Sequence, residues 1–143
     1  MEGTIFDTGL FRVMVPDGWS CFYGTDSSGE TTPKKVHVYK AAMTPVDIFT
    51  HAGITVCYYG PKEYYLSPKH FYDEVRDMEP LTLGAFTWNG YTCTSCGYPY
   101  TMLETQREGI KFQVMILTRN GEYKIGFTDE DVQAVIRSIA ASQ

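Results

Sequence analysis

The sequence lacks the features that define several large classes of protein. No apolar run approaches the roughly 18 residues that a membrane-spanning helix needs, and the first residues do not follow the basic, apolar, small order of a signal peptide. Lys and Arg are few and scattered, and 12 of them against 17 Asp and Glu give a formal net charge of -5. Nucleic acid is therefore not an expected partner. Two locations stay open: the cytoplasm, or export with the signal removed.

Motifs for common enzyme chemistry are also missing. The chain has no Walker loop, no dinucleotide-binding glycine pattern and no nucleophile-elbow serine. Its histidines, His37, His51 and His70, are dispersed. The acidic run 129–131 is accounted for by capping and by the dipole of the helix that follows it. The sequence therefore favours a noncatalytic protein over an enzyme and indicates no cofactor and no metal.

What the sequence does contain is the composition of one folded domain. Hydrophobic residues make up 43% of the 143 residues and charged residues 20%, which are ordinary proportions for a globular protein. A chain of this length buries enough surface to fold without a disulfide or a metal. No internal repeat and no Pro/Gly/Ser-rich linker divides it, so residues 1–143 are expected to form a single domain.

Strand signals recur along the whole chain, as alternating apolar and polar residues that are rich in β-branched and aromatic types. The predicted strands are residues 8–16, 19–23, 35–41, 53–59, 81–88, 91–98, 100–107, 110–118 and 122–127. Asn89-Gly90 and Asn120-Gly121 predict tight hairpin turns, and Glu108-Gly109 predicts a third reversal. The order of these signals indicates an antiparallel meander sheet.

Three helices are expected beside this sheet. Thr44, Pro45 and Asp47 predict a short helix over 45–51, and Ser67-Pro68 predicts a second helix over 67–78. A closing helix is predicted after Thr128, because its apolar residues recur at i, i+3, i+4 and i+7. That stripe consists of Val132, Val135, Ile136 and Ile139. The predicted fold class is α+β, an antiparallel sheet packed against flanking helices.

Two segments resemble PsbP-like domains. The strand and turn from Phe11 to Trp19, which include Pro16-Asp17-Gly18, look like the opening strand of that superfamily. The segment from Val132 to Ile139 resembles its terminal helix, and the meander before it fits the same plan. The resemblance implies an α/β/α sandwich, a fold shared with extrinsic photosystem II subunits, a Ran-binding nuclear import factor and bacterial secreted or lipid-anchored proteins. Those members are mostly binding modules, and none of their functional positions can be carried over residue by residue.

Cys93-Thr94-Ser95-Cys96 is the sharpest chemical motif in the chain. A CxxC pair can cycle between dithiol and disulfide or supply half of a zinc site. On a strand, however, a spacing of three sends the two side chains to opposite faces, and no second close pair of ligands exists. Structural cysteines are therefore the favoured interpretation. A thiol redox or metal-binding protein that uses Cys93 and Cys96 is the alternative.

Tyrosine supplies the predicted binding residues. The chain has 11 tyrosines, and Tyr64, Tyr65, Tyr98 and Tyr100 fall at predicted strand ends and in a loop. Their rings would be free to contact a partner there, although packing over the sheet edge is the competing interpretation. The sequence thus predicts a noncatalytic binding or adaptor domain of unknown ligand, belonging to an exported or cell-surface bacterial protein. The expected partner is a protein or a surface ligand.

Overall fold

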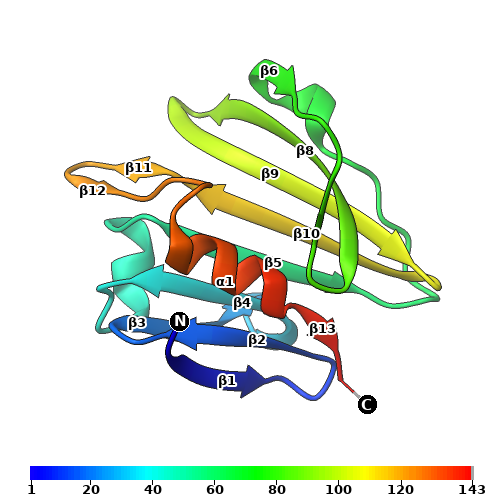
Figure 1. Ribbon diagram of the computed structural model, residues 1–143, viewed down its shortest axis with the longest axis horizontal. Helices are drawn as coiled ribbons and strands as arrows, with labels where there is room; N and C mark the ends of the chain where they lie inside the picture. The colour runs from blue at the N-terminus through cyan, green and yellow to red at the C-terminus, as the bar shows by residue number, and fades with distance from the viewer. Residues whose placement is uncertain (143) are drawn as a thin grey trace.

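Antiparallel strands dominate the computed structural model, which describes residues 1–142 (Figure 1). The large sheet follows the order β3-β4-β5-β10-β9-β8-β6, and β7 pairs with β8 beside that path. Its strands are β3 (Trp19–Thr25), β4 (Thr31–Lys40), β5 (Gly53–Tyr59), β6 (Asp73–Asp77), β7 (Leu81–Leu83), β8 (Phe86–Ser95), β9 (Tyr98–Arg107) and β10 (Ile110–Leu117).

Smaller elements complete the fold. One small sheet holds β1 (Gly3–Asp7), β2 (Phe11–Pro16) and β13 (Ala140–Ala141), and a separate pair is formed by β11 (Arg119–Asn120) and β12 (Tyr123–Lys124). The α-helix is α1 (Glu130–Ser138), and two 3-10 helices are η1 (Pro45–Phe49) and η2 (Lys69–Phe71). No helix within residues 1–142 is long and apolar enough to cross a membrane.

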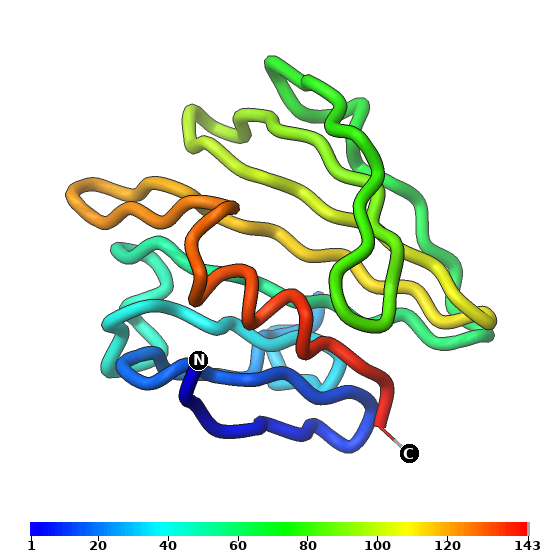
Figure 2. Tube along the Cα trace, in the orientation of Figure 1, coloured from blue at the N-terminus to red at the C-terminus, as the bar shows by residue number. Residues whose placement is uncertain are grey.

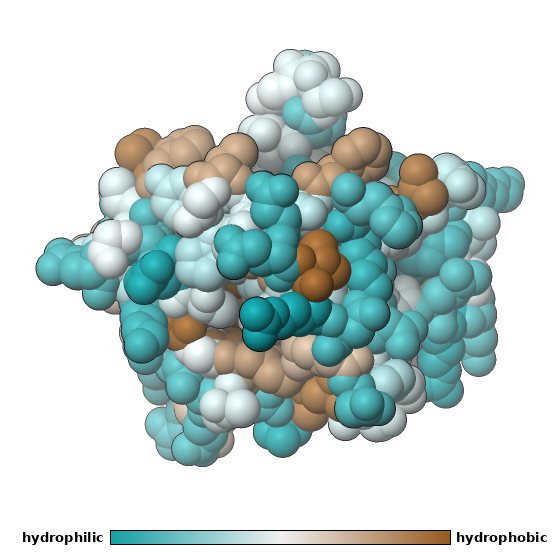
Figure 3. Space-filling view, turned by 90° about the horizontal axis from the view of Figure 1, so that it is seen from above, coloured by the Kyte–Doolittle hydropathy of each residue, from teal (hydrophilic) through white to brown (hydrophobic). Residues whose placement is uncertain are grey.

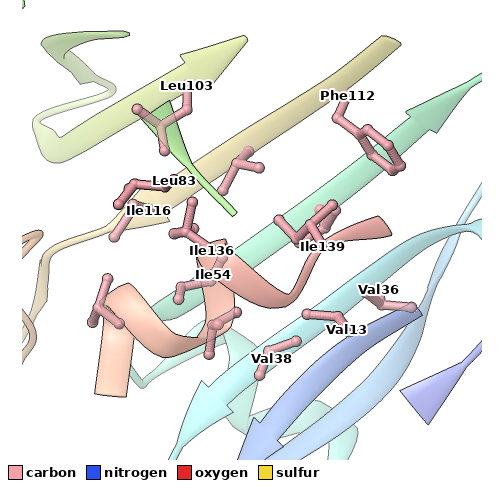
Figure 4. Packing of buried hydrophobic residues seen from close by; sticks show 14 of the residues in the cluster. Val13, Val36, Val38, Ile54, Leu83, Leu103, Phe112, Ile116, Ile136 and Ile139 are labelled. Carbon is pink, nitrogen blue, oxygen red and sulfur yellow. The ribbon is translucent and has the colours of Figure 1, made fainter. Parts of the chain in front are cut away.

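One face of the large sheet, the inner face, is covered by α1 and β2. The two elements come from opposite ends of the chain and lie side by side over the strands (Figures 1 and 2). The main core fills the space between them and the sheet, and Ile136 of α1 and its C-cap residue Ile139 approach the strands that carry Val38 and Ile54 (Figure 4). All four of these side chains are fully buried. The opposite side of the sheet is the outer face.

The closing helix confirms its predicted apolar stripe. Val132, Val135, Ile136 and Ile139 all have 0% exposure. Its N-cap is Asp129, not Thr128, and the Asp129 carboxylate accepts a hydrogen bond of 2.7 Å from the backbone N–H of Gly126. The predicted capping residue was therefore wrong by one position, while the buried face was right.

The predicted α/β/α sandwich with flanking helices is wrong. The residues from 1 to 142 contain one α-helix, and it covers the inner face alone. In place of the helix expected over 67–78, the chain forms η2 and then β6, which pairs with β8. Phe71, which would have begun that helix's apolar stripe, is 84% exposed. The fold is a mostly antiparallel β protein with a single covering layer.

Turn chemistry was predicted correctly at two of three sites. Glu108-Gly109 joins β9 to β10 with φ angles of 53° and 82°, and Asn120-Gly121 lies at the reversal between β11 and β12. Asn89-Gly90 instead lies inside β8, so the predicted hairpin there is wrong. A Cβ on Gly90 would lie 2.9 Å from Leu103 Cδ2, which shows that this glycine permits close approach of neighbouring strands.

The dependence of the fold on α1 gives a first test. We expect Ile136→Ala to lower the free energy of unfolding by about 2–5 kcal/mol, because it leaves a cavity in a fully buried site. Arg137→Ala, on the exposed face of the same helix, should cost less than about 1 kcal/mol. Urea unfolding followed by tryptophan fluorescence measures both. Equal losses in the two variants would contradict the packing described for α1.

Candidate functional site

The end strand β3 leaves part of its backbone without a partner. In the large sheet β3 pairs with β4 alone. Ala41 N donates to Gly18 O over 3.0 Å just beyond their last paired residues. Since hydrogen-bonded pairs alternate along an antiparallel ladder, the N–H and C=O groups of Cys21 and Tyr23 point away from β4. Within residues 1–142 these groups have no hydrogen-bond partner.

An apolar groove of about 570 Å³ runs along this strand, and we call it the edge groove. On the inner-face side its wall is formed by Phe6 of β1 and Tyr23, whose rings meet edge to face at 5.2 Å. On the outer-face side the wall is formed by Phe22 together with Val46 and Phe49 of η1. Backbone of β3 lies between the two walls.

Local sequence explains why η1 presents apolar side chains to solvent. Asp47 Oδ2 accepts hydrogen bonds from Met43 N at 2.7 Å and Thr44 N at 3.1 Å, which closes the predicted capping box. These backbone hydrogen bonds hold the pKa of Asp47 below its ordinary value. No residue of η1 is buried, and Val46 and Phe49 are 68% and 75% exposed. The predicted helix over 45–51 is thus confirmed in place, as a shorter 3-10 helix.

Apolar side chains also remain at the surface more widely on this side of the molecule. They gather along the outer-face margin, which is the upper margin of Figure 3. The large exposed side chains from the two loops on that side are Met43, Val46, Phe49, Tyr64, Leu66 and Phe71. Of these six residues, Val46 and Phe49 line the edge groove beside β3.

The lining of the edge groove carries no charge at neutral pH. Its single titratable base, His37 on β4, places Nδ1 2.7 Å from Thr55 Oγ1. Burial, and then the charge of Lys35, lower the pKa of His37 to about 4. Burial likewise raises the pKa of the Cys21 thiol to about 12. The groove is therefore uncharged in a chain whose net charge is -5.

The state of His37 can be measured directly. We expect its imidazole resonances to titrate near pH 4 instead of the ordinary 6.5. Because the folded pKa is the lower one, the folded chain binds fewer protons, and stability is lost as the pH falls from about 6.5 to about 4. His37→Gln should lose less stability than the wild type between about pH 7 and about pH 4.5. A midpoint near 6.5 would show that the groove wall is solvated.

The structure holds the four predicted tyrosines in two groups. Tyr64 and Tyr65 lie in the segment between β5 and η2, where Tyr64 is 82% exposed and the Tyr65 hydroxyl donates to Glu104 of β9. Tyr98 and Tyr100 lie at the start of β9, and Tyr98 is 46% exposed. Six residues of extended strand separate Tyr98 from Glu104, about 20 Å. The four tyrosines therefore do not form the one patch that was expected, and a binding role for them stays a prediction.

Sequence reasoning missed a buried polar group on the outer face. Tyr91 of β8 is 2% exposed, and its hydroxyl has no hydrogen-bond partner within the described part of the chain. Burial raises the pKa of Tyr91, and the charge of Glu104 raises it further. The nearby Ser67 hydroxyl lowers this pKa, but by less than the two other effects raise it. The strand alternation places Tyr91 on the same face as Met102, its partner in register. No signal in the sequence marks that hydroxyl as unpaired.

The cysteine motif does not form a site. Cys93 is buried in β8, whereas Cys96 is exposed in the turn before β9 with a φ of 51°. All four cysteines are free thiols, and burial raises the pKa values of Cys57, to about 11, and of Cys93. No three His, Cys, Asp or Glu side chains among residues 1–142 could hold a metal ion together. This geometry lends the redox or metal alternative no support.

Thiol counting tests that alternative. In the folded protein we expect Ellman's reagent to modify Cys96 rapidly and the three less accessible thiols only slowly, because the thiolate is the reactive form. Cys96→Ser should remove the rapid phase. Four equivalent thiols should appear in denaturant. A fast paired reaction of Cys93 and Cys96, or a bound metal in the purified protein, would contradict the interpretation of structural cysteines.

Comparison with known proteins yields a fold likeness alone. No family model and no curated protein matches the chain. The structure is similar to a crystal structure of a protein from Bacteroides thetaiotaomicron, with a TM-score of 0.57 at 13% sequence identity. The match covers 100% of this chain and 50% of that one, so the chain spans about half the length of its structural neighbour. The resemblance to PsbP-like domains stays a prediction.

Proposed function

We propose that this protein is a noncatalytic binding domain and that the edge groove holds an apolar segment of a partner protein. The supporting observation is the exposure of Phe49 and Val46, at 75% and 68%, beside Phe22 around an uncharged groove. Monomeric proteins seldom leave contiguous apolar surface open to water without a binding role. The resemblance noted above adds the expectation of an exported or cell-surface adaptor.

The physical basis of such binding is the removal of apolar area from water. Each square ångström of apolar surface buried contributes about 25 cal/mol, and the exposed side chains of Tyr23, Val46 and Phe49 offer such area here. Aromatic side chains also lose little conformational freedom when a partner covers them. The groove therefore has the composition of the central part of an interface, where charge is depleted and aromatic residues are enriched.

Nile red, an uncharged apolar dye, serves as the probe for this proposal. We expect the wild-type protein to enhance and blue-shift its emission and Phe49→Asp to lose most of that signal, because the charge disrupts the outer wall of the groove. Phe71→Asp is the matched control, since Phe71 is 84% exposed in the other loop. Both variants should unfold within about 1 kcal/mol of the wild type. The proposal fails if Phe71→Asp removes as much dye signal as Phe49→Asp.

A further inference from the structure

We infer that the edge groove takes its ligand as an added β-strand: an extended, uncharged peptide that pairs with β3 and has apolar side chains on both of its faces. This inference rests on the proposed function and adds the mode of recognition to it. An added strand gains affinity from main-chain hydrogen bonds and specificity from its alternate side chains. The edge groove supplies both components.

The main-chain component comes from the free side of β3. Cys21 and Tyr23 each direct one N–H and one C=O outward, two residues apart, which is the repeat that a neighbouring strand offers. The register shift between Tyr23 and Gly24 limits the regular edge to the preceding residues. A paired segment would therefore be short, about five or six residues.

The two ends of the large sheet differ in how they are protected. Natural proteins block edge strands with charged residues or proline. The far end, β6, has the sequence Asp-Glu-Val-Arg-Asp, in which four of five residues are charged. By contrast β3 has the sequence Trp-Ser-Cys-Phe-Tyr-Gly-Thr, with neither charge nor proline. At the far end β6 is thus protected by charge, although the short β7 (Leu-Thr-Leu), which also pairs with β8, is not, whereas β3 carries no such protection along its whole length (Figure 1).

The walls of the groove define the side chains of the ligand. Successive residues of an added strand point to opposite faces. Those on the inner-face side would meet Phe6 and Tyr23, and those on the outer-face side would meet Phe22, Val46 and Phe49. Both sets of contacts are apolar, and the neutral His37 adds no charge. A segment with a charged residue on either face would have to desolvate it without a partner.

A single extended segment fits this site better than a second copy of the chain. The groove along β3 is lined by Phe6 of β1 as well as by Val46 and Phe49 of η1. A second copy that paired through its own β3 would bring its own Phe6, Val46 and Phe49 against those of the first copy. One peptide strand has no flanking elements and can enter.

The test uses a library of capped, uncharged six-residue peptides with Val, Ile, Phe or Tyr on both faces, and matched peptides with Glu on one face. We expect the apolar set to bind the full chain and the charged set to bind at least about tenfold more weakly. Cys21→Pro removes the outward N–H and should weaken binding about tenfold, while proline is tolerated where an edge N–H faces solvent. Cys21→Ala keeps that N–H and should bind about tenfold more tightly than Cys21→Pro.

Methylating the backbone nitrogens of the peptide provides a second variant that leaves the protein unchanged. Methylation of the peptide should abolish binding to the wild-type protein, so this test does not depend on whether Cys21→Pro folds. Equal binding of methylated and unmethylated peptides, or of folded Cys21→Pro and Cys21→Ala, would overturn strand addition. A wild-type dimer in sedimentation that Cys21→Pro dissociates would overturn the choice of ligand in favour of a second copy. Nile red binding distinguishes the two proposals. If the protein binds the dye but the peptide experiments fail, the proposed function stands and only binding by strand addition is refuted.

Discussion

The structure depends on the burial of one sheet face beneath a layer built from both ends of the chain. β2 comes from the first residues and α1 from the last, and β13 pairs with β2 directly after the helix ends. Met14 N donates to Ser138 Oγ over 2.7 Å, which ties the middle of β2 to the last residue of α1. Because this layer completes the core, the remaining loops are not needed to bury the inner face. They can expose apolar side chains without the loss of the fold.

Sequence patterns succeeded where a local signal and the tertiary structure required the same residues. The alternation over 53–59 gave β5 with its observed bounds, since β-branched residues there suit a central strand buried on both faces. The stripe of α1 was equally reliable, because a period of 3.6 residues is incompatible with a strand. In both cases the pattern reports burial, and burial is what selects the local conformation.

The errors arose where a local signal competed with pairing between distant strands. Ser67-Pro68 is a good helix start, but the residues after it include Asp73 and Val75, which are poor helix formers. The edge of β8 provides backbone hydrogen-bonding groups with which this segment pairs as β6. Asn89-Gly90 is a good turn, but Gly90 is needed where the strand passes close to Leu103. No single sequence reveals which strands become neighbours, so neither competition could be resolved from the residues alone.

The edge groove was unpredictable for the same reason, although its parts were visible. Phe6, Phe22 and Phe49 lie far apart in the sequence, and each alone is typical of a core residue. What makes them a site is that β3 is the last strand of its sheet, a property of strand order that alternation does not encode. Composition does retain one trace of it. Once strand order is known, the sequences of the two end strands can be compared. The charges of β6 protect it from pairing with another chain, whereas β3 has no charge and is available for pairing.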